Sequence, residues 1–273
     1  MGTASSYTST TSETSQGSQS PLPLALPHTL EFMARLFLAD KDAKSLLNGK
    51  GRDGMNSLHF AVKHSDVQLV QFTLEHGADP DMRDSEGQTP LHLAARSTSS
   101  TSGMVAACLL KHGADPNLLA NEKVDNNFNG FTDVAPLHLA ADRGNLRVAE
   151  QLIEGKTQVD IIDPQHFSTP LFTAVAAGQA GLVKFLLTKG AKVDGDPRAP
   201  ATPLHTAVTH ERIDILQILL CCGANLDVLN EDGKSAIQIA ACNGSMETVK
   251  LLLAVSGGKL NMEDGTSRPA WWA

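Results

Sequence analysis

The sequence has few aromatic residues, few cysteines and no long apolar segment. Aromatic side chains make up 4% of the 273 residues, so a core must be built mainly from Leu, Val, Ile and Ala. The four cysteines show neither the spacing of a zinc site nor a disulfide framework, which indicates reduced thiols in the cytoplasm or the nucleus. No stretch approaches the roughly 20 apolar residues of a membrane-spanning helix, and the polar N-terminus predicts no secretory leader.

Positive charge is also in short supply. The 30 Asp and Glu residues outnumber the 22 Lys and Arg residues and give a formal net charge of −8. An acidic surface repels nucleic-acid phosphates and anionic membranes, so we expect neither nucleic-acid binding nor membrane insertion. The composition therefore favours other proteins as partners, and we expect the chain itself to be a monomer.

A short motif recurs along most of the chain. Residues 89–95 read TPLHLAA, and the second residues of the six copies lie at 57, 90, 136, 170, 203 and 236. The spacings are therefore 33, 46, 34, 33 and 33 residues. A second motif, Gly-Ala, follows in four of the units. A fixed period near 33 is typical of a repeat array, in which each unit packs only on its neighbours.

The two motifs and their spacing resemble the ankyrin repeat over about residues 52–264. This resemblance implies an all-α repeat solenoid, in which each unit is a helix, a turn, a second helix and a β-turn finger. Thr or Ser at the start of the motif can cap the first helix, and the Pro that follows suits the first helical position. We predict six repeats, at 52–84, 85–120, 130–163, 164–196, 197–229 and 230–264.

The remaining segments have different predicted roles. Residues 1–27 are rich in Ser, Thr and Pro and are predicted to be a disordered tail. Residues 28–51 look like a partial N-terminal capping repeat that lacks the TPLH motif, and 265–273 form a C-terminal tail. Two insertions account for the 46-residue spacing: three residues in the inter-helix turn near Ser97, and about ten residues around the loop at 121–129.

The inserted loop contains the strongest local match to a ligand motif. Residues 125–130 read DNNFNG and match the first half of a calcium-binding loop. The candidate ligands are Asp125, Asn127, Asn129 and Asp133. The twelfth position, which should be a bidentate Glu, is Pro136, so an Asn-rich turn is the alternative and we predict no resident metal.

Other candidate motifs are explained by the repeats. Four histidines occupy the same place in their units: His59, His92, His138 and His205. One His per repeat cannot converge on a single metal ion, and in ankyrin repeats, which these positions resemble, this His is structural and bonds along the stack. Residues 49–54 match GxGxxG but do not join a strand to a helix. We therefore predict no cofactor, no catalytic residues and no enzyme activity.

The resemblance implies a non-enzymatic protein-protein interaction module that acts as a scaffold, an adaptor or a sequestering inhibitor. In such stacks the fingers and the first helices line a concave face that recognises partners. The candidate partner-binding residues on this face are Lys63, His64, Glu86, Arg96, Phe131, Asp142, Arg143, His166, His210 and Asn243. The basic residues of the first three repeats suit an acidic or phosphorylated segment, and a solvated surface of mixed charge is the alternative.

Two other functions stay open. One is a calcium-responsive binding module that uses the loop from Asp125 to Gly130. The other is inhibition of a transcription factor in the manner of the IκB proteins, to which the repeat number and the near-central insertion are similar. The chain departs from that group because it has no Asp-Ser-Gly-x-x-Ser degron and no acidic tail after the repeats.

Overall fold

The computed structural model describes residues 43–51, 53–123 and 131–256. Within these ranges the chain forms thirteen α-helices and one two-stranded hairpin. The predicted tails at 1–27 and 265–273 lie outside the described residues, as does most of the predicted loop at 121–129. None of the helices in the described ranges has the length and apolar character that crossing a bilayer requires.

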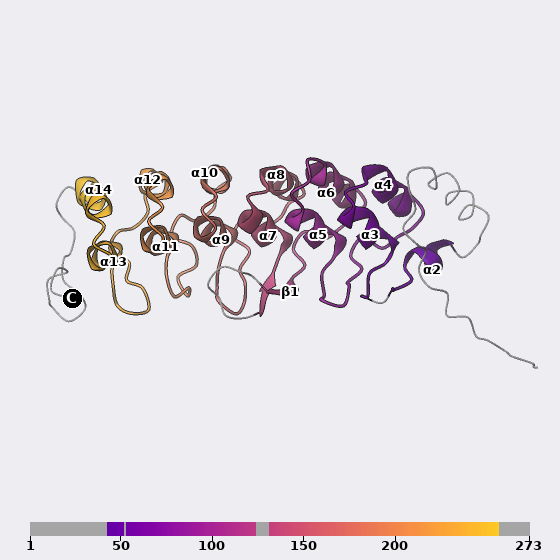
Figure 1. The fold of residues 1–273 in the computed structure, drawn as a ribbon, viewed down its shortest axis with the longest axis horizontal. Coiled ribbons are helices and arrows are strands. Elements are labelled where there is room, and N and C mark those ends of the chain that lie inside the picture. Colours follow the sequence, from indigo (N-terminus) through magenta and orange to yellow (C-terminus); the bar gives the residue numbers. More distant parts are fainter. Residues whose placement is uncertain (1–42, 52, 124–130, 257–273) are drawn as a thin grey trace, which may run out of the picture.

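The helices form two rows (Figure 1). The first helices of the six repeats are α3 (Ser57–Lys63), α5 (Pro90–Arg96), α7 (Pro136–Arg143), α9 (Pro170–Ala176), α11 (Pro203–Thr209) and α13 (Ala236–Cys242). The second helices are α4 (Val67–Glu75), α6 (Ser102–Lys111), α8 (Leu146–Glu154), α10 (Ala180–Thr188), α12 (Ile213–Cys221) and α14 (Met246–Ser256). Each first helix packs on its own second helix and on the first helices of adjacent repeats. The predicted all-α solenoid is confirmed.

Capping residues start the first helices where the motif predicts. The Thr202 Oγ1 accepts from the His205 N–H at 3.4 Å, and the Thr169 Oγ1 accepts from the Phe172 N–H at 3.3 Å. Four of these helices begin with Pro, whose missing N–H has no partner to lose at that position. The repeated sequence therefore fixes where each unit begins.

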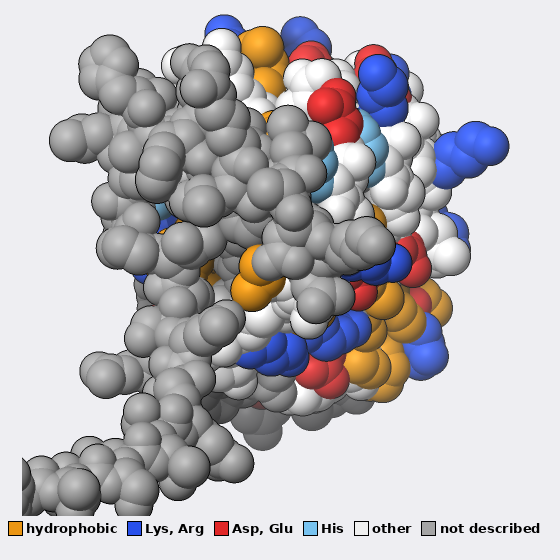
Figure 2. All heavy atoms as spheres, turned by 90° about the vertical axis from the view of Figure 1, so that its right-hand side faces the viewer, with side chains coloured by type: hydrophobic (Ala, Val, Ile, Leu, Met, Phe, Trp, Pro, Cys, Tyr) orange, Lys and Arg blue, Asp and Glu red, His pale blue; other side chains and the backbone are white. Residues whose placement is uncertain are grey.

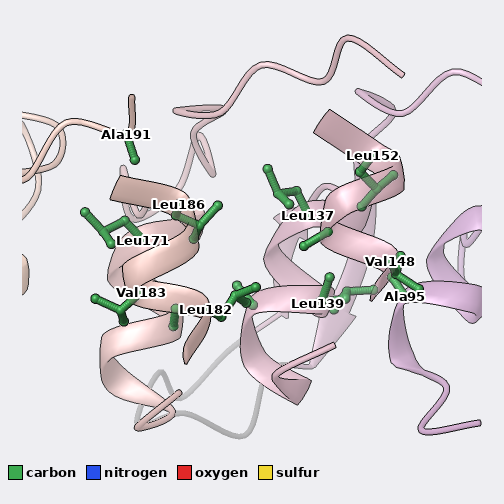
Figure 3. Close-up of a cluster of buried hydrophobic side chains, with 14 of the residues drawn as sticks. Ala95, Leu137, Leu139, Val148, Leu152, Leu171, Leu182, Val183, Leu186 and Ala191 are labelled. Atoms are coloured by element: carbon green, nitrogen blue, oxygen red, sulfur yellow. The ribbon is translucent and has the colours of Figure 1, made fainter. Parts of the chain in front are cut away.

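The core runs along the stack between the two rows (Figure 3). Leu137 and Leu152 of the third repeat are fully buried, as are Leu171 and Leu186 of the fourth. Full burial of one such side chain is worth about 1.5–3 kcal/mol. Aliphatic and Ala side chains make up nearly all of the core in the described ranges, as the low aromatic content predicts.

Glycine turns the chain between the two helices of several repeats. Gly144, Gly178 and Gly244 have φ values of 67°, 76° and 70°, in the left-handed region where side chains are disfavoured. Ser65 and Glu211 take the same position in the first and fifth repeats at φ values of 55° and 53°. These two residues carry backbone strain that glycine would relieve.

The structure contains a hairpin that is not evident from the sequence. β1 (Ala120–Lys123) pairs with β2 (Phe131–Val134) in antiparallel register, with Ala120 opposite Val134. It lies among the fingers in Figure 1. Short polar segments without alternating apolar residues give no strand signal, so the sequence predicts only a loop here. The other predicted insertion appears as the turn at 97–101 between α5 and α6.

A helix before the first full repeat packs against it. α2 (Ala43–Leu47) buries Leu47 in the common core. Asn48, just after α2, donates to the Gly77 carbonyl at 3.2 Å and accepts from the Asp79 N–H at 2.8 Å. These contacts tie α2 to the first repeat in the way that one finger is tied to the next.

Candidate partner-binding site

A row of buried histidines connects consecutive repeats. The His59 Nε2 lies 3.2 Å from the Gln88 carbonyl, the His92 Nε2 lies 3.1 Å from the Val134 carbonyl, and the His138 Nε2 lies 3.1 Å from the Ser168 carbonyl. The Nδ1 of His138 accepts from the Ala135 N–H at 3.3 Å, which leaves the ring proton on Nε2 to donate. His205 keeps the cap contact with the Thr202 N–H. The structural role predicted for these histidines is confirmed for the first three.

Burial keeps these rings neutral. It lowers the pKa of His59, His138 and His205, and it lowers the pKa of His92 to about 4. The cause is desolvation, because a protonated ring loses its water in the core. We call these four buried histidines the histidine ladder. The histidine ladder therefore stabilises the stack and offers no site for a partner.

The fingers are tied together at their bases. The Asp115 N–H donates to the Asp81 carboxylate at 2.9 Å, and the Asn225 N–H donates to the Asp194 carboxylate at 2.9 Å. The Lys192 N–H makes the same bond to Asp160 at 3.0 Å. These bonds fix the spacing of the fingers, so the side chains at the fingertips are not needed for stacking.

Seven of the predicted partner-binding residues lie at the C-terminal ends of first helices. They are Lys63, His64, Arg96, Asp142, Arg143, His210 and Asn243. Most are exposed, while Arg96, Asp142 and His210 are partly buried. The Arg143 Nε lies 3.3 Å from the Asp142 Oδ2. We call these seven residues the helix-end row; it follows the stack and does not converge on one point.

The other three predicted residues lie outside the helix-end row. Glu86 is exposed on the finger before α5. His166, on the finger before α9, places Nδ1 2.8 Å from the Asp163 Oδ2. Phe131 belongs to β2, opposite Lys123. The predicted set is therefore spread over helix ends, fingers and the hairpin.

The charges at the N-terminal end are mixed. Figure 2 shows Lys and Arg side chains next to Asp and Glu side chains on the part of this end that is described, rather than a field of one sign. The contact between Arg143 and Asp142 fits the same pattern farther along the stack. The helix-end row is thus less basic than its Lys and Arg residues alone predict.

The structure brings together a cluster, not predicted from the sequence, at the tips of two neighbouring fingers. Phe167 precedes α9, and the Arg198 guanidinium, from the finger before α11, lies 4.6 Å from the centre of its ring. The Asp196 carboxylate holds Arg198 through its Nε at 2.8 Å and its Nη2 at 2.9 Å. Hydrogen bonds from Arg198 lower the pKa of Asp196 to about 2. The available signal was the 34-residue spacing between the third and fourth motifs.

The calcium prediction falls mostly outside the described residues. Asp125, Asn127 and Asn129 are in the undescribed 124–130 segment, while Asp133 lies on β2 opposite Asn121. In the ranges that the structure describes, no three His, Cys, Asp or Glu residues are grouped to hold a metal. The calcium loop stays a prediction, and a calcium-dependent rise in melting temperature would support it.

The comparisons with known proteins agree with this architecture. A family model described as ankyrin repeats (3 copies) matches residues 117–196, 137–230 and 204–273. Models for ankyrin repeats (many copies) and for the single ankyrin repeat match residues 38–94 and 86–121. The chain belongs to the ankyrin repeat family, and the array is a protein-interaction module.

Individual relatives share the repeats within very different proteins. The chain is 34% identical over 155 residues to palmitoyltransferase AKR1 of Lachancea kluyveri, covering 57% of this chain and 20% of that one. It is 31% identical over 138 residues to NF-kappa-B inhibitor alpha of Mus musculus, covering 51% and 40%. The ankyrin repeat domain of Bcl-3, a member of the IkappaB family, superposes with a TM-score of 0.68 at 25% identity, covering 80% of this chain and 93% of that domain. The chain spans a fifth or less of the first curated relatives.

Proposed function

We propose that this chain is a non-enzymatic module that binds a partner protein through the face formed by the fingers and the first helices. The observation that carries this proposal is that some positions of the repeat make the same bonds in successive repeats, while other positions vary. The ladder histidines and the finger bases make the same bonds from repeat to repeat, while the side chains of the helix-end row and the fingertips differ from one repeat to the next. Side chains that vary while the stacking bonds stay constant can recognise a partner.

The proposal includes work as a scaffold, an adaptor or a sequestering inhibitor, with other proteins as partners. The net charge of −8 argues against nucleic acid and anionic membranes. We also propose that the protein is a monomer in the cytoplasm or the nucleus, which fits four cysteines that are free in the described structure.

A pull-down from cell extract tests the binding face. The test variant carries Arg96→Glu, Arg143→Glu and His210→Ala in the helix-end row. The matched control carries Lys184→Glu and Lys250→Glu, which reverse two charges at exposed positions of α10 and α14. Circular dichroism melts check that both variants keep the fold.

We expect the natural protein and the control to retain partners that the test variant loses. Partners lost from the control alone would place binding on the second helices and contradict the proposed face. Partners retained by both variants would exclude the helix-end row and leave the fingers as the remaining part of that face.

The second candidate is inhibition of a transcription factor, and its support is the likeness to the ankyrin repeat domain of Bcl-3 in the IkappaB family. A DNA mobility-shift assay with purified NF-κB would test it. Release of the factor from DNA by this protein would support an IκB-like role, and an unchanged shift at saturating protein would exclude it.

A further inference from the structure

The finger before α9 differs from the other fingers at its tip. It has seven residues from Asp163 to Thr169, where the finger before α5 has six from Asp84 to Thr89. The extra residue accounts for the 34-residue spacing between two motifs. Two residues before the helix cap, the fingers before α3, α5 and α13 have glycine at φ values of 70°, 77° and 71°. At the equivalent position this finger has Phe167, at a φ of 54°.

An aromatic residue in this region is strained, because its Cβ crowds the backbone, and glycine would remove the strain. Local bonds nevertheless hold the finger in place. The Asp163 carboxylate is fully buried and accepts from the Gln165 N–H at 3.0 Å and the His166 N–H at 3.2 Å. The Phe167 N–H donates to the Asp163 carbonyl at 2.8 Å. Strain that is maintained in this way is characteristic of binding sites.

The neighbouring finger fixes the aromatic ring from the other side. The Arg198 guanidinium lies over the ring, and two of the guanidinium nitrogens donate hydrogen bonds to the Asp196 carboxylate. Because Arg198 is paired with Asp196, the opposite charges at the tip of this finger cancel. Exposed Pro164 and Pro197 lie next to these residues in the sequence. We call His166, Phe167, Asp196 and Arg198, with these two prolines, the fingertip patch.

We propose that the fingertip patch is the energetic centre of partner binding, and that its occupant is a protein segment that places an aliphatic or aromatic side chain against Phe167. This inference rests on the proposed protein-binding function and refines where the partner binds. Aromatic and Arg side chains dominate the binding energy of many interfaces. Here both are already ordered, so binding costs little further side-chain entropy. A patch with paired charges complements an apolar segment better than a strongly charged one.

A random-peptide phage library panned on the whole chain provides the probe. Enriched peptides are synthesised, and their affinities are measured by fluorescence anisotropy for the natural protein and four variants. Phe167→Gly removes the ring and the strain, while Phe167→Ala removes the ring alone. Glu211→Gly is the matched control, because it relieves the same kind of strain away from the patch. Arg143→Glu tests the helix-end row.

We expect enriched peptides to share an apolar anchor and to bind with little dependence on salt. Both Phe167 variants should weaken binding by at least about tenfold, while Glu211→Gly leaves it unchanged and Arg143→Glu weakens it less than either Phe167 variant does. Phe167→Gly should melt about 2–4 °C above Phe167→Ala, which separates loss of binding from loss of fold.

Two outcomes would overturn the assignment. Peptides that bind both Phe167 variants normally and lose affinity for Arg143→Glu, with strong salt dependence, would move the site to the helix-end row and leave the proposed function standing. A library that yields no peptide specific for the natural protein would count against both the patch and the proposed function.

Discussion

The histidine ladder and the fingertips are two sets of positions that recur along the stack. The ladder keeps the same residue and bond in successive repeats, whereas the fingertips change residue. In the ladder, His59, His92 and His138 repeat one bond to the next repeat at nearly the same distance. At the fingertips, glycine in three fingers gives way to Phe167 in a fourth. Uniformity marks positions that every repeat interface needs, and departure marks positions that stacking leaves free. Partner-binding residues in a repeat protein are therefore best sought at positions that depart from the repeat pattern.

The largest effect on stability is expected from a substitution in the histidine ladder. His138→Ala should lower the free energy of unfolding by about 2–4 kcal/mol, because it opens a cavity and deprives the Ser168 carbonyl of a donor. His64→Ala, at an exposed position, should change it by less than about 0.5 kcal/mol. Urea denaturation of both variants measures the difference. Equal effects would mean that the ladder contributes no more than the surface does.

Acid should weaken the ladder as a whole. Burial lowers the pKa of these histidines. Below about pH 6.5 they therefore become protonated in the unfolded chain while they stay neutral in the folded chain. The stabilising contribution is present above that pH and is lost as the pH falls toward about 4, the pKa of His92. For His92 alone the loss between pH 7 and pH 5 is about 2 kcal/mol.

Urea unfolding at several pH values tests this loss. The control is His92→Gln, since Gln238 takes the same position in the sixth repeat and accepts from the Ser235 N–H at 2.7 Å. The variant should show a flatter pH dependence than the natural protein. An identical slope for the two proteins would exclude His92 as a source of the acid sensitivity.

Strained turns should give a smaller effect of opposite sign. Glu211→Gly should raise the free energy of unfolding by about 0.5–1 kcal/mol, because Glu211 has a φ of 53°. Gly178→Ala makes the reverse change at the equivalent turn, where φ is 76°, and should lower it by about 1 kcal/mol. Thermal melts of both variants give the comparison. A destabilised Glu211→Gly variant would show that Glu211 makes contacts worth more than its strain.

The smallest expected effect on stability lies at the fingertips. Arg198→Ala removes an exposed pair with Asp196 and should leave the melting temperature unchanged within error. The same change should weaken the binding of any peptide that contacts the fingertip patch, because the Phe167 ring loses the Arg198 side chain that fixes it. Calorimetry and anisotropy measure the two quantities. A clear drop in melting temperature would assign Arg198 to the fold rather than to binding.

Most of the repeat architecture could be predicted from local sequence. The TPLH motif contains its own cap, its own first helical residue and the histidine that bonds to the cap backbone, so a single unit already specifies where a helix begins. The candidate site was predictable only in part. The position of Lys63 or Arg143 at a helix end follows from the period, but the nearby Asp142 reduces the charge that sequence alone assigns to the row.

The period could be read directly from the sequence, and the helices and the turns with glycine followed because each depends on residues a few positions apart. The histidine ladder was implied by the family resemblance, since its bonds join residues in different repeats. Only the tertiary structure decided which departures from the repeat meet in space. Phe167 and Arg198 are 31 residues apart and face each other because two fingers stand side by side. β1 and β2 likewise pair across an insertion. Such contacts depend on how repeats stack, and no local pattern encodes them.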